Sequence, residues 1–130
     1  MKTKRSSVRA ARGLSDAFGL PRTAERIMTS LGNSGRYMSV KEIVRRVKMS
    51  ERSVRKYLKV LVERGLLCRR AIARGRRVAY EYSLRSSREL LKATRREFAV
   101  TIERLEAIVV GLGRRRKARA SSKSASSSRS

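Results

Sequence analysis

Apolar residues recur at helical spacing early in the chain. The segment LPRTAERIMTSLG, residues 20–32, predicts a helix whose apolar face consists of Leu20, Ala24, Ile27, Met28 and Leu31. Pro21 suits the first turn of this helix, and Gly32 suits the position after its last turn. A shorter helical piece is expected just before it, around residues 14–18, and the tripeptide NSG breaks the chain after it.

A second, shorter helix is predicted from the segment SVKEIVRRVKM. Ser39 is followed three residues later by Glu42, which is a capping-box signature at a helix N-terminus. Apolar residues then repeat at i, i+3, i+4 and i+7, as Val40, Ile43, Val44 and Val47. Lys48 and Met49 are expected to form a tight connection to the next element.

A third helix is predicted to follow this connection at once. Ser50 is a suitable N-cap, and the helix is expected to run to Gly65, because glycine adopts the left-handed conformation that ends many helices. The predicted buried face consists of Val54, Tyr57, Leu58 and Leu61.

After Gly65 the hydrophobic period changes from that of a helix to that of a strand. The segments LLCRRAIA and RVAYEYSL flank Arg74 and Gly75 and predict two strands around a tight turn. In the second segment, alternate positions are apolar: Val78, Tyr80, Tyr82 and Leu84. Tyr80 and Tyr82 are therefore expected in the core, and base stacking by their rings is the less favoured alternative.

From Arg85 the pattern returns to that of a helix. Between Leu90 and Leu112, apolar residues recur every seven positions, with Thr94, Thr101 and Ile108 at the intervening positions. This heptad pattern predicts a homodimer interface at Leu91, Phe98, Ile102, Leu105, Ile108, Val109 and Leu112. The alternative is that the face packs on the chain's own core, which is expected for its first turn.

The order of predicted elements is helix, helix, helix, hairpin, long helix. It indicates a mainly α fold with a small β-hairpin wing, a winged helix-turn-helix plus a long C-terminal dimerisation helix. The expected domains are a basic disordered tail at 1–13, the winged helix-turn-helix at 14–84, the dimerisation helix at 85–113 and a basic Ser-rich disordered tail at 114–130.

The charge of the chain is concentrated in one window. The sequence has 35 Lys and Arg against 10 Asp and Glu, a net charge of +25. Residues 36–77 carry fifteen bases and three acids, whereas residues 14–35 and 78–113 are almost balanced. This imbalance indicates a polyanionic partner, and double-stranded DNA suits the predicted fold.

The side-chain inventory argues against an enzyme. The chain has no histidine, no cluster of metal ligands and no Gly-rich phosphate loop, so no catalytic residue, metal or cofactor is predicted. The single cysteine, Cys68, is expected to be a small buried hydrophobic residue, with redox sensing as the alternative. No apolar run of transmembrane or signal-peptide type occurs, which predicts a cytoplasmic protein. Binding to DNA would associate it with the nucleoid.

The predicted third helix has a basic face opposite its apolar face. An α-helix fits the major groove of B-DNA, and the N-terminal half of a recognition helix usually reaches the base edges. Arg52, Ser53 and Lys56 are therefore the predicted base-reading residues, and Arg55 and Lys59 are expected at phosphates. A merely solvated helix surface is the alternative interpretation.

The predicted wing and second helix supply further contacts. Arginines cluster on the hairpin, where they are expected at the DNA backbone or an adjacent minor groove: Arg69, Arg70, Arg74, Arg76 and Arg77. Ser39 and Lys41, at the start of the second helix, are also expected at the backbone. The alternative is that the hairpin is basic for solubility alone.

The chain resembles archaeal winged-helix transcription regulators of the TrmB and MarR-like groups. FGLPRTAERIMTSL is similar to the first helix of the TrmB type, and YMSVKEIVRRVKMSERSVRKYLKVLVERGLLCRR is similar to the shared helix-turn-helix with its entry into the wing. The resemblance covers about residues 18–84 and implies a homodimer that binds operator DNA. No sugar-binding domain follows, as it does in larger TrmB regulators, so no small-molecule effector is evident.

Three functions remain open from the sequence. The favoured one is a dimeric DNA-binding transcription regulator. An abundant architectural DNA-binding protein of low sequence specificity is the first alternative, because both ends of the chain are basic. An RNA-binding or ribosomal protein is the second, although a heptad helix suited to self-pairing does not favour it.

Overall fold

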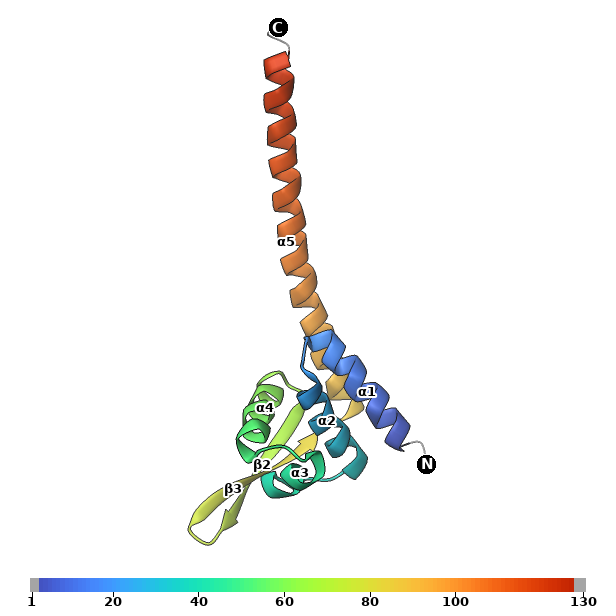
Figure 1. Ribbon diagram of the computed structural model, residues 1–130, viewed down its shortest axis with the longest axis vertical. Coiled ribbons are helices and arrows are strands. Elements are labelled where there is room, and N and C mark those ends of the chain that lie inside the picture. The colour runs from blue at the N-terminus through green and yellow to red at the C-terminus, as the bar shows by residue number, and fades with distance from the viewer. Residues whose placement is uncertain (1–2, 128–130) are drawn as a thin grey trace. The chain divides into compact units, whose positions relative to one another are not determined.

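The computed structural model describes the backbone of residues 3–127 and the side chains of residues 7–116. The described residues form five helices and a three-stranded sheet (Figure 1). In chain order the elements are α1 (Thr3–Phe18), α2 (Arg22–Ser34), β1 (Met38–Ser39), α3 (Val40–Val47), α4 (Glu51–Glu63), β2 (Leu67–Arg74), β3 (Arg77–Leu84) and α5 (Ser87–Ser127). The fold is the expected mainly α winged helix-turn-helix with a long C-terminal helix.

The chain separates into two compact units, residues 1–95 and residues 96–130, with the boundary inside α5. The first unit contains the helix-turn-helix, the sheet and the start of α5. The second consists of the remainder of α5. Within residues 3–127, no helix has the length and apolar character that a bilayer span requires.

The helix-turn-helix is formed by α3 and α4, and its caps agree with the sequence prediction. The Ser39 hydroxyl accepts a hydrogen bond from the Glu42 amide, and the Glu42 carboxylate accepts from the Ser39 amide, which completes the capping box. Ser50 caps α4 by accepting from the Ser53 amide at 3.2 Å. Lys48 links the helices in the left-handed conformation, with φ of 53°.

The sheet has the strand order β1-β3-β2, and all neighbours are antiparallel. β2 and β3 pair along their whole length, from Leu67 opposite Leu84 to Arg74 opposite Arg77. Gly75, with φ of 63°, supplies the left-handed conformation that the two-residue turn requires. β1, which the sequence analysis did not predict, adds Met38 and Ser39 to the base of β3.

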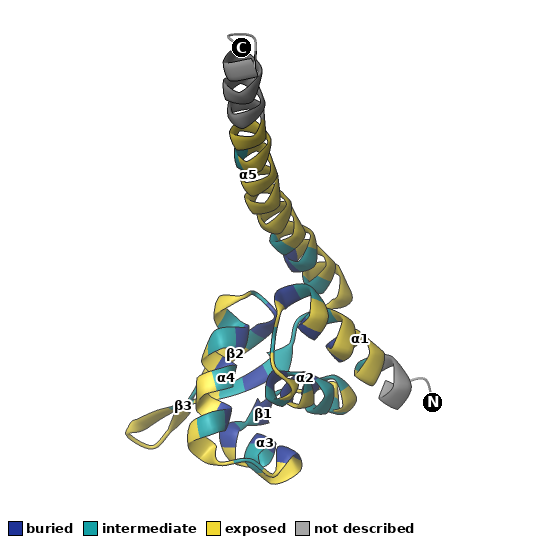
Figure 2. Cartoon of the chain, turned by 45° about the horizontal axis from the view of Figure 1, so that its top comes forward, coloured by how far each residue is buried: buried dark blue, intermediate teal, exposed yellow. Residues whose placement is uncertain are grey.

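The core lies where α2, α3 and α4 meet the base of the sheet, as the dark blue faces in Figure 2 show. Each helix contributes the apolar residues that its period predicted. The largest fully buried side chains are Ile27, Met28, Leu31, Met38, Ile43, Val54, Leu58, Leu61, Leu66 and Leu67. Burial of such side chains contributes about 1.5–3 kcal/mol each to folding stability. The face of α4 that carries Val54, Leu58 and Leu61 is therefore firmly attached to the core.

One predicted core residue is exposed. Tyr82 is only 8% exposed, but Tyr80 is 40% exposed and Val78 65%, although all three share a face of β3. The hairpin extends beyond the helices, so no helix of the described chain covers that face near its tip (Figure 2). The prediction that Tyr80 lies in the core is therefore wrong.

The N-terminal region differs from the expected disordered tail at residues 1–13. Residues 3–18 form α1, which packs on α2, while residues 1–2 lie outside the described residues. Ala11, Ser15 and Phe18 are buried at i, i+4 and i+7, so α1 has a narrow apolar face despite its basic composition.

Gly32 lies within α2 and does not follow the helix, contrary to the prediction. A Cβ at Gly32 would lie 3.0 Å from the Ser7 hydroxyl, so the glycine permits the close approach of α1. α2 instead ends at Gly35, which has φ of 62° and donates its amide to the Leu31 carbonyl.

The C-terminal region also differs from the expected disordered tail at residues 114–130. α5 continues to Ser127, and residues 128–130 lie outside the described residues. This segment has no proline or glycine, and its alanine, lysine and arginine residues favour helix, although serine is its most frequent residue.

Candidate nucleic-acid interface

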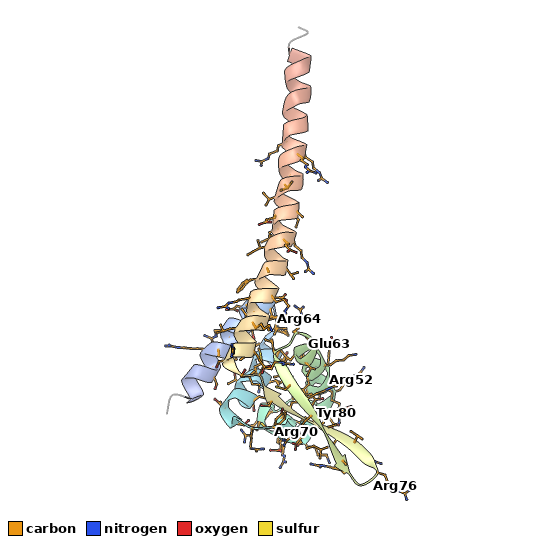
Figure 3. The ribbon with its side chains drawn as sticks, turned by 180° about the vertical axis from the view of Figure 1, so that it is seen from behind. Arg52, Glu63, Arg64, Arg70, Arg76 and Tyr80 are labelled. Carbon is orange, nitrogen blue, oxygen red and sulfur yellow. The ribbon has the colours of Figure 1, made fainter. Side chains whose placement is uncertain are left out.

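The face of α4 opposite the core is basic and exposed. Val54, Leu58 and Leu61 anchor the helix, whereas Arg52, Lys56 and Lys59 are exposed. Arg52 lies near the start of α4, and Glu63 and Arg64 lie at its far end (Figure 3). Three of the five predicted positions on this helix therefore point to solvent with their charges accessible.

The Lys56 ammonium lies 5.6 Å from the centre of the Tyr57 ring, and the other two predicted positions of α4 make hydrogen bonds or an ion pair within the helix. The Ser53 hydroxyl accepts a hydrogen bond from the Ser50 hydroxyl at 2.9 Å, so it belongs to the N-terminal cap. The Arg55 guanidinium pairs with the Glu51 carboxylate at 3.3 Å, one turn earlier. Both residues of that pair are more than half exposed, so the pair is weak and a stronger anion can displace the carboxylate.

A groove of about 330 Å³ joins the helix-turn-helix to the hairpin. Ser39 and Lys41 from the start of α3, Glu51 and Arg55 from the start of α4, and residues of β2 and β3 line it. It brings together five residues predicted to contact DNA, namely Ser39, Lys41, Arg55, Arg74 and Arg77. Ile72, Val78 and Tyr80 are among its apolar lining residues, which the sequence analysis did not predict to line a groove.

The exposed Arg70 side chain makes contacts with other residues of the same chain. Its guanidinium lies 4.1 Å from the centre of the Tyr37 ring and 2.8 Å from the Glu81 carboxylate, which lies directly opposite on β3. Ser39 of β1 also pairs with Glu81, so the three groups join the hairpin to the segment before α3. Although predicted as a DNA contact, Arg70 has the geometry of a residue that fixes the wing.

The remaining arginines of the wing lie nearer its tip. Arg74 and Arg77 are opposite each other at the end of the ladder, and Arg76 is in the turn, at the free end of the hairpin in Figure 3. All three are exposed. Arg69 is also exposed, but its guanidinium stacks 4.6 Å from the centre of the Tyr80 ring. That contact gives the exposed Tyr80 a role in orienting a cation.

Two ion pairs perturb carboxylates at helix N-termini. A hydrogen bond from Arg36 lowers the pKa of the Glu42 carboxyl, with the Ser39 amide acting in the same direction. At the start of α5, a hydrogen bond from Arg85 lowers the pKa of Glu89, and the Ser86 hydroxyl accepts from the Glu89 amide. Both carboxylates remain ionised at neutral pH, and each stabilises its helix because it lies near the positive N-terminal end of the helix dipole.

The apolar face predicted for dimerisation is exposed on the single chain. Phe98 is 49% exposed and Val109 63%, and the other five predicted positions are exposed as well, namely Leu91, Ile102, Leu105, Ile108 and Leu112. In Figure 2 most of the described part of α5 has the colour of exposed residues. Within α5, Ala93 is buried and Leu90 is half-buried against the core of the first unit. The expected packing of the first turn is therefore present.

Comparisons with known proteins agree with this architecture. Residues 18–78, just under half of the chain, match the model of the MarR family. A possible transcriptional regulator from Methanosarcina mazei Go1 is similar in structure, with a TM-score of 0.64 and 19% identity over 75% of this chain and 84% of that chain. A crystal structure of a protein from the thermoacidophilic archaeon Sulfolobus tokodaii has a TM-score of 0.60 and 20% identity, covering 84% and 99%. No curated protein matches the sequence.

Proposed function

Because this chain carries the winged helix-turn-helix of the MarR family, we propose that it is a dimeric DNA-binding transcription regulator. In this proposal α4 enters the major groove, the hairpin contacts the backbone or the adjacent minor groove, and α5 pairs with its counterpart in a second chain. The protein then resides on the nucleoid.

The observation that carries the proposal is the division of α4 into two faces. Burial of Val54, Leu58 and Leu61 fixes the orientation of the helix, so the cations opposite them are presented in a defined direction. A helix with side chains is about 10–12 Å across, and the major groove is about 12 Å wide. The exposed face therefore suits insertion into the groove.

The contacts of each cation suggest its role. Arg52 and Lys56 lie in the N-terminal half of α4 and are the proposed base-reading residues, and Arg52 suits the two acceptors of guanine. Lys59 and Arg55 are proposed at phosphates, where Arg55 exchanges Glu51 for the DNA backbone. Lys41 at the start of α3 is proposed at the backbone, together with Arg74, Arg76 and Arg77 of the hairpin.

Self-pairing through α5 completes the proposed assembly. The exposed apolar positions on α5 recur at heptad spacing, which suits burial against a second copy of the helix. Two-fold pairing presents two copies of α4 to half-sites that are about one helical turn apart.

The experiment that tests the reading role uses a DNA site mapped by footprinting. We expect Arg52→Ala and Lys56→Ala each to weaken binding to that site by about 1–3 kcal/mol while leaving thermal unfolding unchanged. Arg96→Ala removes one exposed cation from α5 and serves as the control. Unchanged affinity in both α4 variants contradicts the proposed role of this helix.

One observation supports the architectural alternative. Arg114, Arg115 and Arg116 are exposed on α5, in the second unit and outside the helix-turn-helix. Such cations bind DNA without regard to sequence. Their contribution is tested at the scale of the whole molecule below.

A further inference from the structure

A second concave region lies within the first unit, between α1, α2 and the end of α3. This cleft has a volume of about 620 Å³ and shares no lining residue with the groove beside the hairpin. Its volume is within the range of about 300–1,000 Å³ that is typical of small-molecule sites. None of its residues has a place in the proposed DNA interface.

The lining of the cleft is cationic. Arg12 comes from α1, Arg22 and Arg26 from the first turns of α2, and Arg46 from the last turn of α3. The only carboxylate in the lining is Glu25, which lies 3.5 Å from Arg12. Four guanidiniums face one carboxylate, and the Arg12 side chain is 69% exposed, so the cleft retains an excess of positive charge.

Arg22 and Arg26 lie one turn apart at the start of α2. The N-terminal end of a helix carries a partial positive charge, which adds to the charge of these two arginines. Guanidinium groups present paired N–H donors that match the oxygens of phosphate.

Arg26 connects the cleft to the helix-turn-helix. Its guanidinium donates to the Val47 carbonyl, the last of α3, and Val47 also lines the cleft. Three residues later Ser50 caps α4. An anion that engages Arg26 therefore competes with a contact that closes α3 immediately before the connection to the recognition helix.

We propose that this cleft binds a phosphate group through Arg12, Arg22, Arg26 and Arg46. Two sources supply that chemistry, a phosphate-bearing small molecule or the backbone of bound DNA. The small-molecule case does not depend on the proposed regulatory function, whereas the DNA case rests on it. Either occupant alters the hydrogen bond between Arg26 and Val47, so occupancy is coupled to the start of α4.

The test compares two full-length double variants of equal charge. Arg22→Gln with Arg46→Gln removes two cleft cations for which the structure records no contact among the described residues, and it leaves the Arg12 and Arg26 contacts intact. Arg96→Gln with Arg104→Gln removes two exposed cations of α5 as the control. Thermal unfolding establishes that each variant is folded, and the single variants Arg22→Gln and Arg46→Gln replace the pair if it is not.

The first measurement titrates each protein with inorganic pyrophosphate by calorimetry at fixed ionic strength. For a small-molecule site, we expect the cleft variant to bind pyrophosphate about tenfold more weakly than the control variant. The control variant accounts for the general attraction of a basic protein for anions, so the difference between the two variants decides the result.

The second measurement follows DNA affinity against salt concentration. If the backbone of DNA fills the cleft, we expect the slope of log affinity against log salt to fall by about 1 in the cleft variant relative to the control, with equal pyrophosphate affinities. Equal pyrophosphate affinities together with equal slopes overturn the proposal. If no DNA binding is found at all, the regulatory function fails and the calorimetric comparison alone decides the cleft.

Discussion

Arg70 and Arg52 are both exposed arginines of the same basic window, but their surroundings give them different roles. Arg52 is exposed on the outer face of α4, whereas Arg70 lies between the Tyr37 ring and the Glu81 carboxylate. The tie at Arg70 joins β2 to β3 and to the segment before α3. We therefore propose that Arg70 affects DNA binding indirectly, by fixing the position of the hairpin.

We expect Arg70→Ala to destabilise the fold by about 0.5–1 kcal/mol, since exposed ion pairs and ring contacts are each weak. DNA affinity should fall because the hairpin loses its fixed orientation, while the salt slope stays unchanged because no phosphate contact is lost. Arg74→Ala is the matched variant and should lower the slope by about 1. A slope reduced equally by both changes would show that Arg70 itself meets a phosphate.

The Glu42 carboxylate makes stability depend on pH. Because its pKa is lowered in the folded chain, its contribution is fully present above the unfolded value, about 4.5, and is lost as the pH falls through the folded value. We expect Glu42→Gln to lower the melting temperature at pH 7, and we expect the difference from the unmodified chain to be smaller at pH 4, below the unfolded value. Glu106→Gln, an exposed change on α5, is the control; an equal deficit at both pH values would contradict this origin.

Single residues show where sequence patterns suffice. The caps at Ser39 and Ser50 were predictable because capping depends on residues within one turn of each other. Gly32 was misassigned because its close neighbour is Ser7, far away in the sequence. Tyr80 was misassigned because alternation identifies the face of a strand but not whether another element covers it. The contacts of Arg70 with Tyr37 and Glu81 could not be predicted, because they depend on how the three strands pair and no local sequence pattern specifies that pairing.

Among the elements, α5 carries most of the exposed large hydrophobic residues of the described chain. Leu105 and Phe98 are about half exposed, and the heptad spacing aligns them with the other apolar positions of the helix. Isolated helices derive little stability from their own hydrogen bonds, so an exposed apolar face favours a partner. A second copy supplies the same heptad pattern.

We expect Phe98→Glu combined with Leu105→Glu to convert the proposed dimer into a monomer. The reason is that each introduced carboxylate would face its own symmetry copy in an apolar interface. Light scattering measures the mass directly, and Glu103→Ala with Arg104→Ala provides a control on the same stretch of helix. A mass unchanged by the glutamates would exclude this face as the interface.

The elements that escaped prediction were those with few or unusual residues. β1 is only two residues long, and it is defined entirely by its pairing with β3. The start of α1 was hidden by basic and serine residues, although Ala11, Ser15 and Phe18 already have helical spacing. The helices α2, α3 and α4 followed their hydrophobic periods, because each of them buries its apolar face in the common core.

At the scale of the whole molecule, the net charge of +25 is not confined to the helix-turn-helix and the hairpin, because both ends of the chain are basic as well. The regulator and the architectural alternative differ in how much binding energy comes from contacts outside the winged fold. Electrostatic contacts with phosphates supply essentially all of non-specific binding. Measuring how much the cations at the end of α5 contribute to DNA binding therefore distinguishes the two functions.

We expect genome-wide occupancy of the full chain to show discrete sites that persist when residues 114–130 are removed, with the background between sites reduced. Replacing Arg114, Arg115 and Arg116 by glutamine in the full chain is the matched control, because it removes charge without shortening the chain. Broad coverage that collapses in both variants would establish the architectural function.

The open edge of the hairpin has a consequence for solubility. β2 is the outer strand of the sheet, and β1 covers only the base of β3, so both strands present unpaired backbone groups near the tip. Such edges invite pairing between molecules, and charged side chains discourage it. Arg69, Arg70 and Arg74 lie along β2, next to the exposed Val78 and Tyr80. We therefore expect the arginines of the wing to keep separate copies of the protein from joining edge to edge.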